Sequence, residues 1–299
     1  MTGVLDRGLW GVLATPFDEH LNVDFESLRN EVASFTEDGC CGLVALGVFG
    51  EAASLQPAEA AAVAQTVASS TDLPYVLGLS ERSPDAVVSQ ALRLLGAVPR
   101  PPTALMAQIS DADPVVAAES LRRLHEATGT GVLIQDYPVV SGVNVTDEQV
   151  VALVRACPFA VGVKSETPPT SVAVARLATS VDVPVFGGLG GVGLLDELAS
   201  GSAGAMTGFS HPSVLASVLR GYNDGGFTAA RDVFAPWLPL ANFEGQLRIG
   251  LSIRKEVLRR RGVIAGSRVR PPALPLPDLL VPLLDQHLAT LPVAGHPSR

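Results

Sequence analysis

Short apolar runs alternate strictly with helix-like segments from residue 9 to residue 208 of this 299-residue chain. Most of these runs are continuous rather than alternating in polarity, which is typical of parallel strands covered on both faces. Eight strand–helix units in this order favour a closed (β/α)₈ TIM barrel over a doubly wound open sheet, because open sheets usually have fewer strands. The expected strands are Leu9–Phe17, Gly42–Gly47, Tyr75–Ser80, Thr103–Gln108, Gly131–Tyr137, Ala160–Glu166, Pro184–Gly188 and Ala203–Gly208.

Helix-start signals stand between the strands, and the strand signals stop beyond Tyr222. Pro57, Pro84 and Pro114 each suit the first turn of a helix, because the proline ring presets the backbone angle needed there. We therefore expect a barrel over residues 1–222 and a three-helix C-terminal extension over residues 223–299, packed on the barrel. The helices expected in the extension are Phe227–Asn242, Gln246–Arg261 and Leu276–Ala289.

Composition and charge exclude several classes of protein. Hydrophobic residues make up 47% and charged residues 17% of the chain, which is enough apolar material for a large core. The net charge of -9 leaves no basic stripe, so neither nucleic acid nor a membrane is expected as a partner. The first residues lack a signal-peptide pattern, no long apolar run spans a membrane, and the three cysteines have neither metal-ligand nor disulfide spacing. We expect a cytoplasmic protein with reduced thiols.

One lysine closes an apolar strand in a chain that otherwise uses arginine for positive charge. Lys164 ends the sixth expected strand, and Lys255 is the only other lysine. A lysine buried at a strand end tends to lose its proton and become nucleophilic, whereas arginine cannot form an imine. The alternative is a lysine whose ammonium group reaches solvent. Because barrel active sites lie at the C-terminal ends of the strands, we interpret Lys164 as a candidate imine-forming nucleophile.

Two further strand ends carry chemically useful groups. The fifth expected strand ends at Tyr137, a candidate general acid or base, with a core tyrosine as the alternative. The second is followed by Gly47-Val48-Phe49-Gly50, where two glycines permit a tight turn with outward N–H groups suited to a carboxylate. Such a glycine pair alone often marks only a turn. The combination is more specific than its parts, because all three features lie on the same rim of the barrel.

Together these motifs resemble the dihydrodipicolinate synthase/N-acetylneuraminate lyase family of class I aldolases. The resemblance covers nearly the whole chain and includes Ala14-Thr15-Pro16-Phe17, Gly162-Val163-Lys164 and Gly204-Ala205-Met206-Thr207-Gly208. It implies a Schiff-base lysine at Lys164, a proton-shuttling tyrosine at Tyr137, carboxylate binding by the Gly47–Gly50 turn, and a pocket lined by Met206. It also implies a homotetramer, built as a dimer of dimers, or a dimer. The covalent imine takes the place of a cofactor.

Departures from the family pattern narrow the expected substrate. In the family, the turn normally carries two threonines. In this chain their positions are occupied by Val48 and Phe49. Synthases of the lysine pathway also carry a tyrosine after strand four and an arginine shortly after the strand-five tyrosine, and neither is present. The synthase activity, which makes 4-hydroxy-tetrahydrodipicolinate from pyruvate and aspartate semialdehyde, is therefore the alternative function rather than the expected one. The resemblance is greater to the branch that dehydrates or cleaves 2-keto-3-deoxy sugar acids.

The predicted activity is that of a Schiff-base lyase acting on a small 2-keto acid, as a dehydratase or an aldolase, without a metal. Glu166 lies on the same strand face as Lys164 by two-residue alternation, and we expect it to bind a substrate hydroxyl or assist proton transfer. An ion pair at the rim is its alternative role. The glycine run at Gly188 leaves room for a bulky substrate, or forms only a tight turn. A catalytically silent barrel that senses a ligand and a metal-dependent aldolase are the rival functions.

Overall fold

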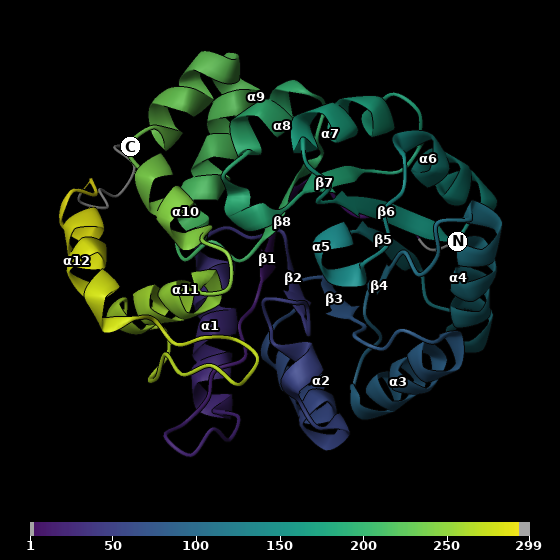
Figure 1. Ribbon diagram of the computed structural model, residues 1–299, viewed down its shortest axis with the longest axis horizontal. Coiled ribbons are helices and arrows are strands. Elements are labelled where there is room, and N and C mark those ends of the chain that lie inside the picture. Colours follow the sequence, from purple (N-terminus) through teal and green to yellow (C-terminus); the bar gives the residue numbers. More distant parts are fainter. Residues whose placement is uncertain (1–2, 293–299) are drawn as a thin grey trace.

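The computed structural model describes residues 3–292, and its sheet is a closed barrel of eight parallel strands in chain order (Figure 1). All the expected strands are present, and closure of the sheet confirms the (β/α)₈ prediction. The first strand is shorter than expected, because Phe17 instead forms an antiparallel bridge with Val23 beyond the barrel. The strands are β1 Gly8–Val12, β2 Gly42–Ala45, β3 Tyr75–Gly78, β4 Ala104–Gln108, β5 Val132–Asp136, β6 Ala160–Ser165, β7 Val185–Gly187 and β8 Gly204–Thr207.

Helices surround the barrel, and their starts follow local sequence signals. Pro57, Pro84 and Pro114 each occupy the first turn of a helix, as predicted. Asp113 caps the third of these by accepting a hydrogen bond from the Val115 N–H at 2.9 Å. The helices are α1 Phe25–Glu37, α2 Pro57–Ser70, α3 Pro84–Ala97, α4 Pro114–Thr128, α5 Pro138–Ser141, α6 Asp147–Ala156, α7 Thr170–Ala178, α8 Leu194–Ala199 and α9 Pro212–Phe234, with short 3₁₀ turns η1 Ala52–Ser54 and η2 Leu189–Gly191.

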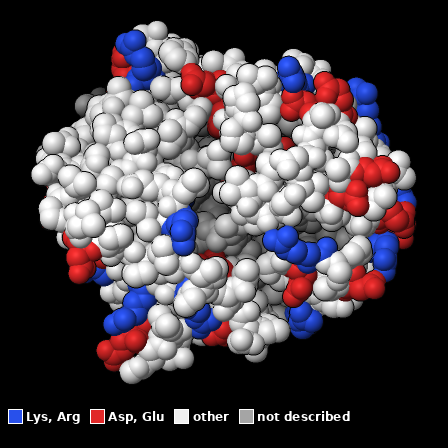
Figure 2. Space-filling view, in the orientation of Figure 1, with Lys and Arg blue, Asp and Glu red and all other residues white. Residues whose placement is uncertain are grey.

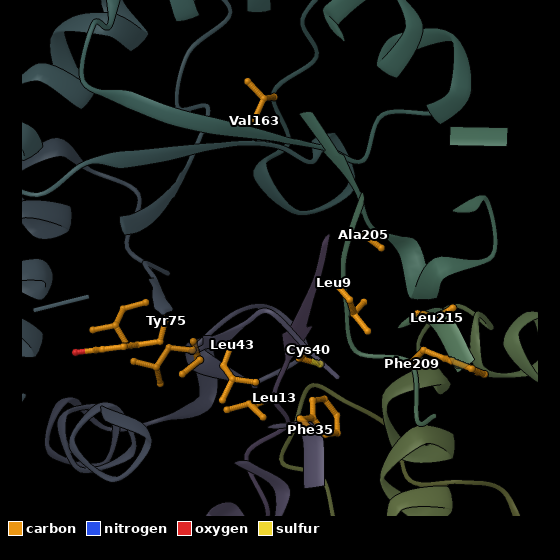
Figure 3. Packing of buried hydrophobic residues seen from close by; sticks show 14 of the residues in the cluster. Leu9, Leu13, Phe35, Cys40, Leu43, Tyr75, Val163, Ala205, Phe209 and Leu215 are labelled. Atoms are coloured by element: carbon orange, nitrogen blue, oxygen red, sulfur yellow. The ribbon is translucent and has the colours of Figure 1, made fainter. Parts of the chain in front are cut away.

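The apolar core has two layers, separated by the sheet. Successive side chains of a strand alternate between them, so Leu9 packs outward against the helices while Trp10 fills the barrel interior. Figure 3 shows the outer layer, where Phe35 of α1 lies near Leu9 and Cys40. Because the interior is filled with side chains, the barrel has no open channel, and chemistry is confined to its ends.

The C-terminal extension begins inside the last barrel helix. The predicted boundary at 222/223 falls within α9, which breaks from helical geometry only at Gly226, where φ is +70°. The helix predicted at Phe227–Asn242 was therefore wrong in its bounds, because it joins the end of α9 to a separate helix. The extension contains α10 Leu238–Glu244, α11 Gly250–Arg260, η3 Asp278–Leu280 and α12 Val281–Ala289. In the extension, α10 contacts η2 at the end of β7, and α12 packs on α10 at the outer edge of the molecule (Figure 1).

Among residues 3–292, no helix is both long and apolar enough to cross a membrane. The same part of the chain holds no group of three or more His, Cys, Asp or Glu side chains arranged for a metal ion.

Candidate active site

A pocket of about 780 Å³ opens at the C-terminal ends of the barrel strands. Figure 2 shows the corresponding face hollowed near its middle, with Lys and Arg side chains at the margin. The pocket walls come from the loops after the strands and from α10 and α11 of the extension. Most of the predicted site residues line it, but Gly50 and Gly188 do not. Those that line it are Gly47, Val48, Phe49, Tyr137, Lys164, Glu166 and Met206.

Lys164 and Glu166 form a buried pair at the end of β6. Their side chains are only 8% and 6% exposed, and Lys164 Nζ lies 3.1 Å from Glu166 Oε2. Gln135 on β5 donates a hydrogen bond to the same carboxylate oxygen at 2.7 Å. The ammonium group therefore does not reach out to bulk solvent, and the carboxylate beside it is placed to exchange a proton with it.

The turn after β7 is shaped around the Glu166 carboxylate. Leu189, Gly190 and Gly191 all have positive φ, at 46°, 74° and 77°, and the Leu189 N–H donates to Glu166 Oε1 at 3.3 Å. A Cβ on Gly188 would lie 2.3 Å from the same oxygen. Gly188 does not line the pocket, so its missing side chain makes room for Glu166 rather than for a substrate.

The Gly47–Gly50 segment forms a tight turn over the end of β2. It is closed by the Glu51 N–H, which donates to the Val48 carbonyl at 3.0 Å, and it is anchored by Thr15, whose hydroxyl donates to the Gly50 carbonyl at 2.6 Å. Within residues 3–292, the N–H groups of Val48, Phe49 and Gly50 donate to no other protein group. Three neighbouring unpaired amides suit the binding of a carboxylate.

Glu51, which follows this turn, is held by the second lysine of the chain. Lys255 on α11 is fully buried and donates to Glu51 and, at 2.9 Å, to the Arg268 carbonyl. Its Nζ also lies 4.3 Å from the centre of the Phe17 ring. Burial lowers the pKa of Lys255, while the nearby Glu51 carboxylate opposes that shift. Lys255 therefore ties the extension to the carboxylate-binding turn.

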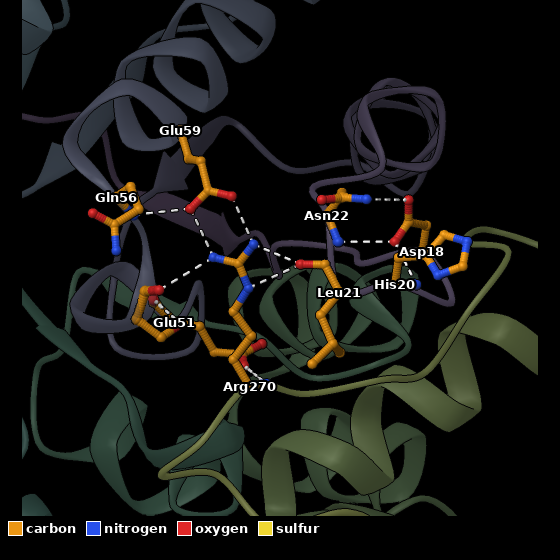
Figure 4. A network of polar contacts seen from close by, with 9 residues as sticks. Asp18, His20, Leu21, Asn22, Glu51, Gln56, Glu59 and Arg270 are labelled. Atoms are coloured by element: carbon orange, nitrogen blue, oxygen red, sulfur yellow. Dashed lines mark hydrogen bonds and ion pairs between the residues drawn. The ribbon is translucent and has the colours of Figure 1, made fainter.

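Arg270 extends this connection toward the first barrel loop. Figure 4 shows its guanidinium between Glu59 at the start of α2 and the Leu21 carbonyl. It donates to the Glu59 carboxylate at 2.6 and 2.7 Å and to Leu21 at 2.6 and 3.0 Å, and its backbone N–H donates to Glu51 at 2.8 Å. The bidentate pairing fixes the turn against segments that are remote in sequence.

Tyr137 stands at the pocket wall directly after β5. It is half-buried and occupies the N-cap position of α5, with φ of -140°. Burial and the negative charge of Glu166 raise the pKa of Tyr137, while the positive charge of Arg254 opposes the rise. The phenol is therefore within electrostatic reach of both Glu166 and an arginine from α11.

Two pocket residues on the extension were missed by the sequence analysis. Arg254 on α11 and Glu244 on α10 both line the pocket, and Arg254 Nε lies 3.5 Å from Glu244 Oε2. Glu244 is fully buried, which raises its pKa to about 7, and it accepts a hydrogen bond from the Ser210 N–H at 3.2 Å. Arg254 lies three and four positions before the buried Val257 and Leu258, and this helical spacing was a usable sign that it faces the protein interior.

The chain is similar in sequence and in fold to several known proteins. A profile of the dihydrodipicolinate synthetase family matches residues 6–73. The L-2-keto-3-deoxyarabonate dehydratase of Azospirillum brasilense is 26% identical over 285 residues, covering 91% of this chain and 89% of that protein. The 4-hydroxy-tetrahydrodipicolinate synthase of Porphyromonas gingivalis is 29% identical over 164 residues, covering 53% of this chain and 54% of that protein. The crystal structure of dihydrodipicolinate synthase from Rhodopseudomonas palustris superposes with a TM-score of 0.87 at 28% identity, covering 97% of this chain and 100% of that one.

Proposed function

We propose that Lys164 forms an imine with a 2-keto-3-deoxy sugar acid. The chain belongs to the dihydrodipicolinate synthetase family and is a lyase of the class I aldolase type. The observation that carries the proposal is the buried Lys164, 3.1 Å from Glu166, in a pocket that also presents Tyr137 and the amides of the Gly47–Gly50 turn. The Azospirillum brasilense relative, a dehydratase of such an acid, supports dehydration as the reaction.

Imine formation begins with loss of a proton from the Lys164 ammonium group. Glu166 accepts that proton, and the neutral amine attacks the C2 carbonyl to form a carbinolamine. Glu166 returns a proton to the carbinolamine hydroxyl, which leaves as water and yields the imine. The C1 carboxylate of the substrate accepts hydrogen bonds from the N–H groups of Val48 and Phe49, which line the pocket. The proposal includes no external cofactor, because the protonated imine is itself the electron sink.

Tyr137 carries the proton in the steps that follow. Glu166, a carboxylate again once the imine has formed, takes the phenol proton of Tyr137 and returns it at the end of the cycle. The phenolate takes a C3 proton, and the C3–H electrons form an enamine. As phenol it then protonates the C4 hydroxyl, which leaves as water. Hydrolysis of the resulting imine consumes one water and frees Lys164, so the net reaction is loss of one water. If the phenolate instead takes the C4 hydroxyl proton, the C3–C4 bond breaks and the products are pyruvate and an aldehyde.

Borohydride reduction in the presence of pyruvate tests the imine directly. We expect a reduced adduct on Lys164 by peptide mass spectrometry, and none in Lys164→Arg, which retains the positive charge but cannot form an imine. Lys164→Arg should lose all turnover, that is, more than about a thousandfold. Labelling of Lys255, or activity retained in Lys164→Arg, would contradict the proposal.

The reaction type is tested with 2-keto-3-deoxyarabonate as substrate. We expect loss of water without release of pyruvate. Separate assays of the dehydrated product and of pyruvate measure the two reactions. Pyruvate release would assign cleavage. Condensation of pyruvate with aspartate semialdehyde is the control reaction for the synthase alternative. The homotetramer or dimer expected from the family is a further proposal, which light scattering of the purified protein measures.

A further inference from the structure

We infer that Arg254 binds a second carboxylate of the substrate, at the end remote from the keto group, so that the preferred 2-keto-3-deoxy acid is a diacid. This inference rests on the proposed imine at Lys164. Arg254 reaches the pocket wall from α11, and its side chain is only 13% exposed. The C1 carboxylate already has its proposed site at the amides of the Gly47–Gly50 turn.

The guanidinium of Arg254 has donors left over. Its Nε is buried without a hydrogen-bond partner in the part of the chain that the structure describes, although Glu244 lies 3.5 Å away. Glu244 thus faces Arg254 as an ion-pair partner without a hydrogen bond to Nε, while its two oxygens accept hydrogen bonds from the N–H and the hydroxyl of Ser210. A buried guanidinium with unsatisfied donors is costly, and a carboxylate from a ligand would satisfy them in a bidentate manner.

The backbone opposite Arg254 is shaped to admit the guanidinium. A Cβ on Gly190 would lie 2.3 Å from Arg254 Nη2, and Gly190 has a φ of +74° that favours glycine. On its other side, the guanidinium carbon lies 5.2 Å from the centre of the Phe49 ring. Phe49 stands where the family usually has a threonine, so its ring and Gly190 together hold the arginine in the pocket wall.

Two ligands of equal length isolate the second carboxylate. Both 2-oxoglutarate and 2-oxopentanoate carry a C1 carboxylate and a C2 ketone on a five-carbon chain, and only the first has a terminal carboxylate. The half-saturating concentration of each is measured by borohydride trapping on Lys164. We expect 2-oxoglutarate to be trapped at a concentration about tenfold or more below that of 2-oxopentanoate.

Substitution of Arg254 should abolish this preference. In Arg254→Met we expect the ratio between the two ligands to fall to about one, and Arg254→Lys should keep part of it. Arg254→Met leaves the buried Glu244 without a cation. The ratio is therefore also measured in the double variant Arg254→Met/Glu244→Gln, in which this uncompensated negative charge is removed. Arg100→Met is the matched control. That arginine donates to the carbonyls of Ala68, Thr71 and Leu73, away from the pocket, and its loss should leave the ratio unchanged.

The outcomes separate this inference from the imine proposal. A ratio that survives in both Arg254→Met and Arg254→Met/Glu244→Gln would overturn the assignment. Equal weakening of both ligands would also overturn it, because that result indicates a role at the C1 carboxylate or in folding. A change confined to the pH profile would assign Arg254 to Tyr137 instead and would overturn it as well. Failure of pyruvate itself to label Lys164 in the unaltered protein would refute the imine, and the diacid assignment with it.

Discussion

At the scale of single residues, the pocket depends on glycines that make room for charged groups. Gly188 leaves space for the Glu166 carboxylate and Gly190 for the Arg254 guanidinium, and a Cβ at either position would lie 2.3 Å from the charged group. These glycines therefore set the positions of a carboxylate and a guanidinium in the site that contains Lys164. Their effect on chemistry is indirect, because neither needs to touch the substrate.

Gly188→Ala should lower kcat/KM by about a hundredfold, because it displaces Glu166 from Lys164 and small misplacements of reacting groups are expensive. Steady-state kinetics and the rate of borohydride trapping check this expectation. Gly96→Ala is the control, since no atom lies within 4 Å of a Cβ at that position. Equal kinetics in the two variants would show that the position of Glu166 is not critical.

At the scale of elements, α11 supplies two neighbouring cations with different tasks. Arg254 faces the pocket, while Lys255 is buried against Glu51 and secures the carboxylate-binding turn. Of the two lysines of the chain, Lys164 thus lies at a strand end in the pocket, whereas Lys255 lies on a helix and supports the turn. The extension is part of the site, because α10 and α11 complete the pocket wall.

Lys255→Met should reduce the free energy of unfolding by about 3–5 kcal/mol, because it leaves the buried Glu51 without its cation. Urea denaturation measures the loss. The double variant Lys255→Met/Glu51→Gln should recover part of it, since the uncompensated charge is removed. In whichever variant remains folded, borohydride and pyruvate should still label Lys164; loss of labelling with an intact fold would argue against a purely structural Lys255.

At the scale of the whole molecule, buried ionisable groups make stability depend on pH. Burial raises the pKa of Glu31 to about 8 and those of Glu197 and Glu244 to about 7, and it lowers the pKa of His211 to about 3. Between their unfolded and folded pKa values, the three carboxyl groups bind more protons in the native state. Their contribution to stability therefore falls as pH rises toward 8, while the buried neutral His211 favours unfolding as pH falls below about 6.5.

The free energy of unfolding should fall between about pH 6.5 and pH 8, where the carboxyl groups act and His211 does not. Glu31→Gln should flatten this decline by up to about 1.4 kcal/mol per pH unit, because it removes one titrating group. Urea denaturation at several pH values measures the slope. The exposed Glu126→Gln is the control, and an identical slope in both variants would show that Glu31 does not titrate in this range.

Much of the fold was predictable because its signals are local. Apolar runs of strand length, prolines at helix starts and glycines after strands act within a few residues of one another, so eight parallel strands and their order could be predicted. Parallel strands in a closed barrel also end at one rim. For that reason Lys164, Tyr137 and the Gly47–Gly50 turn could be assigned to one pocket without coordinates.

The remaining site residues depend on contacts between remote segments, which no local pattern encodes. Lys255 and Glu51 are 204 positions apart, and Arg270 and Glu59 are 211 apart. Whether Glu166 pairs with Lys164, whether Gly188 faces the substrate or a carboxylate, and whether Arg254 enters the pocket all follow from how side chains pack across the barrel rim. The strand pattern thus placed the lysine and tyrosine at the rim, and only the packing of side chains across that rim, including those of the extension, decided which charges surround them.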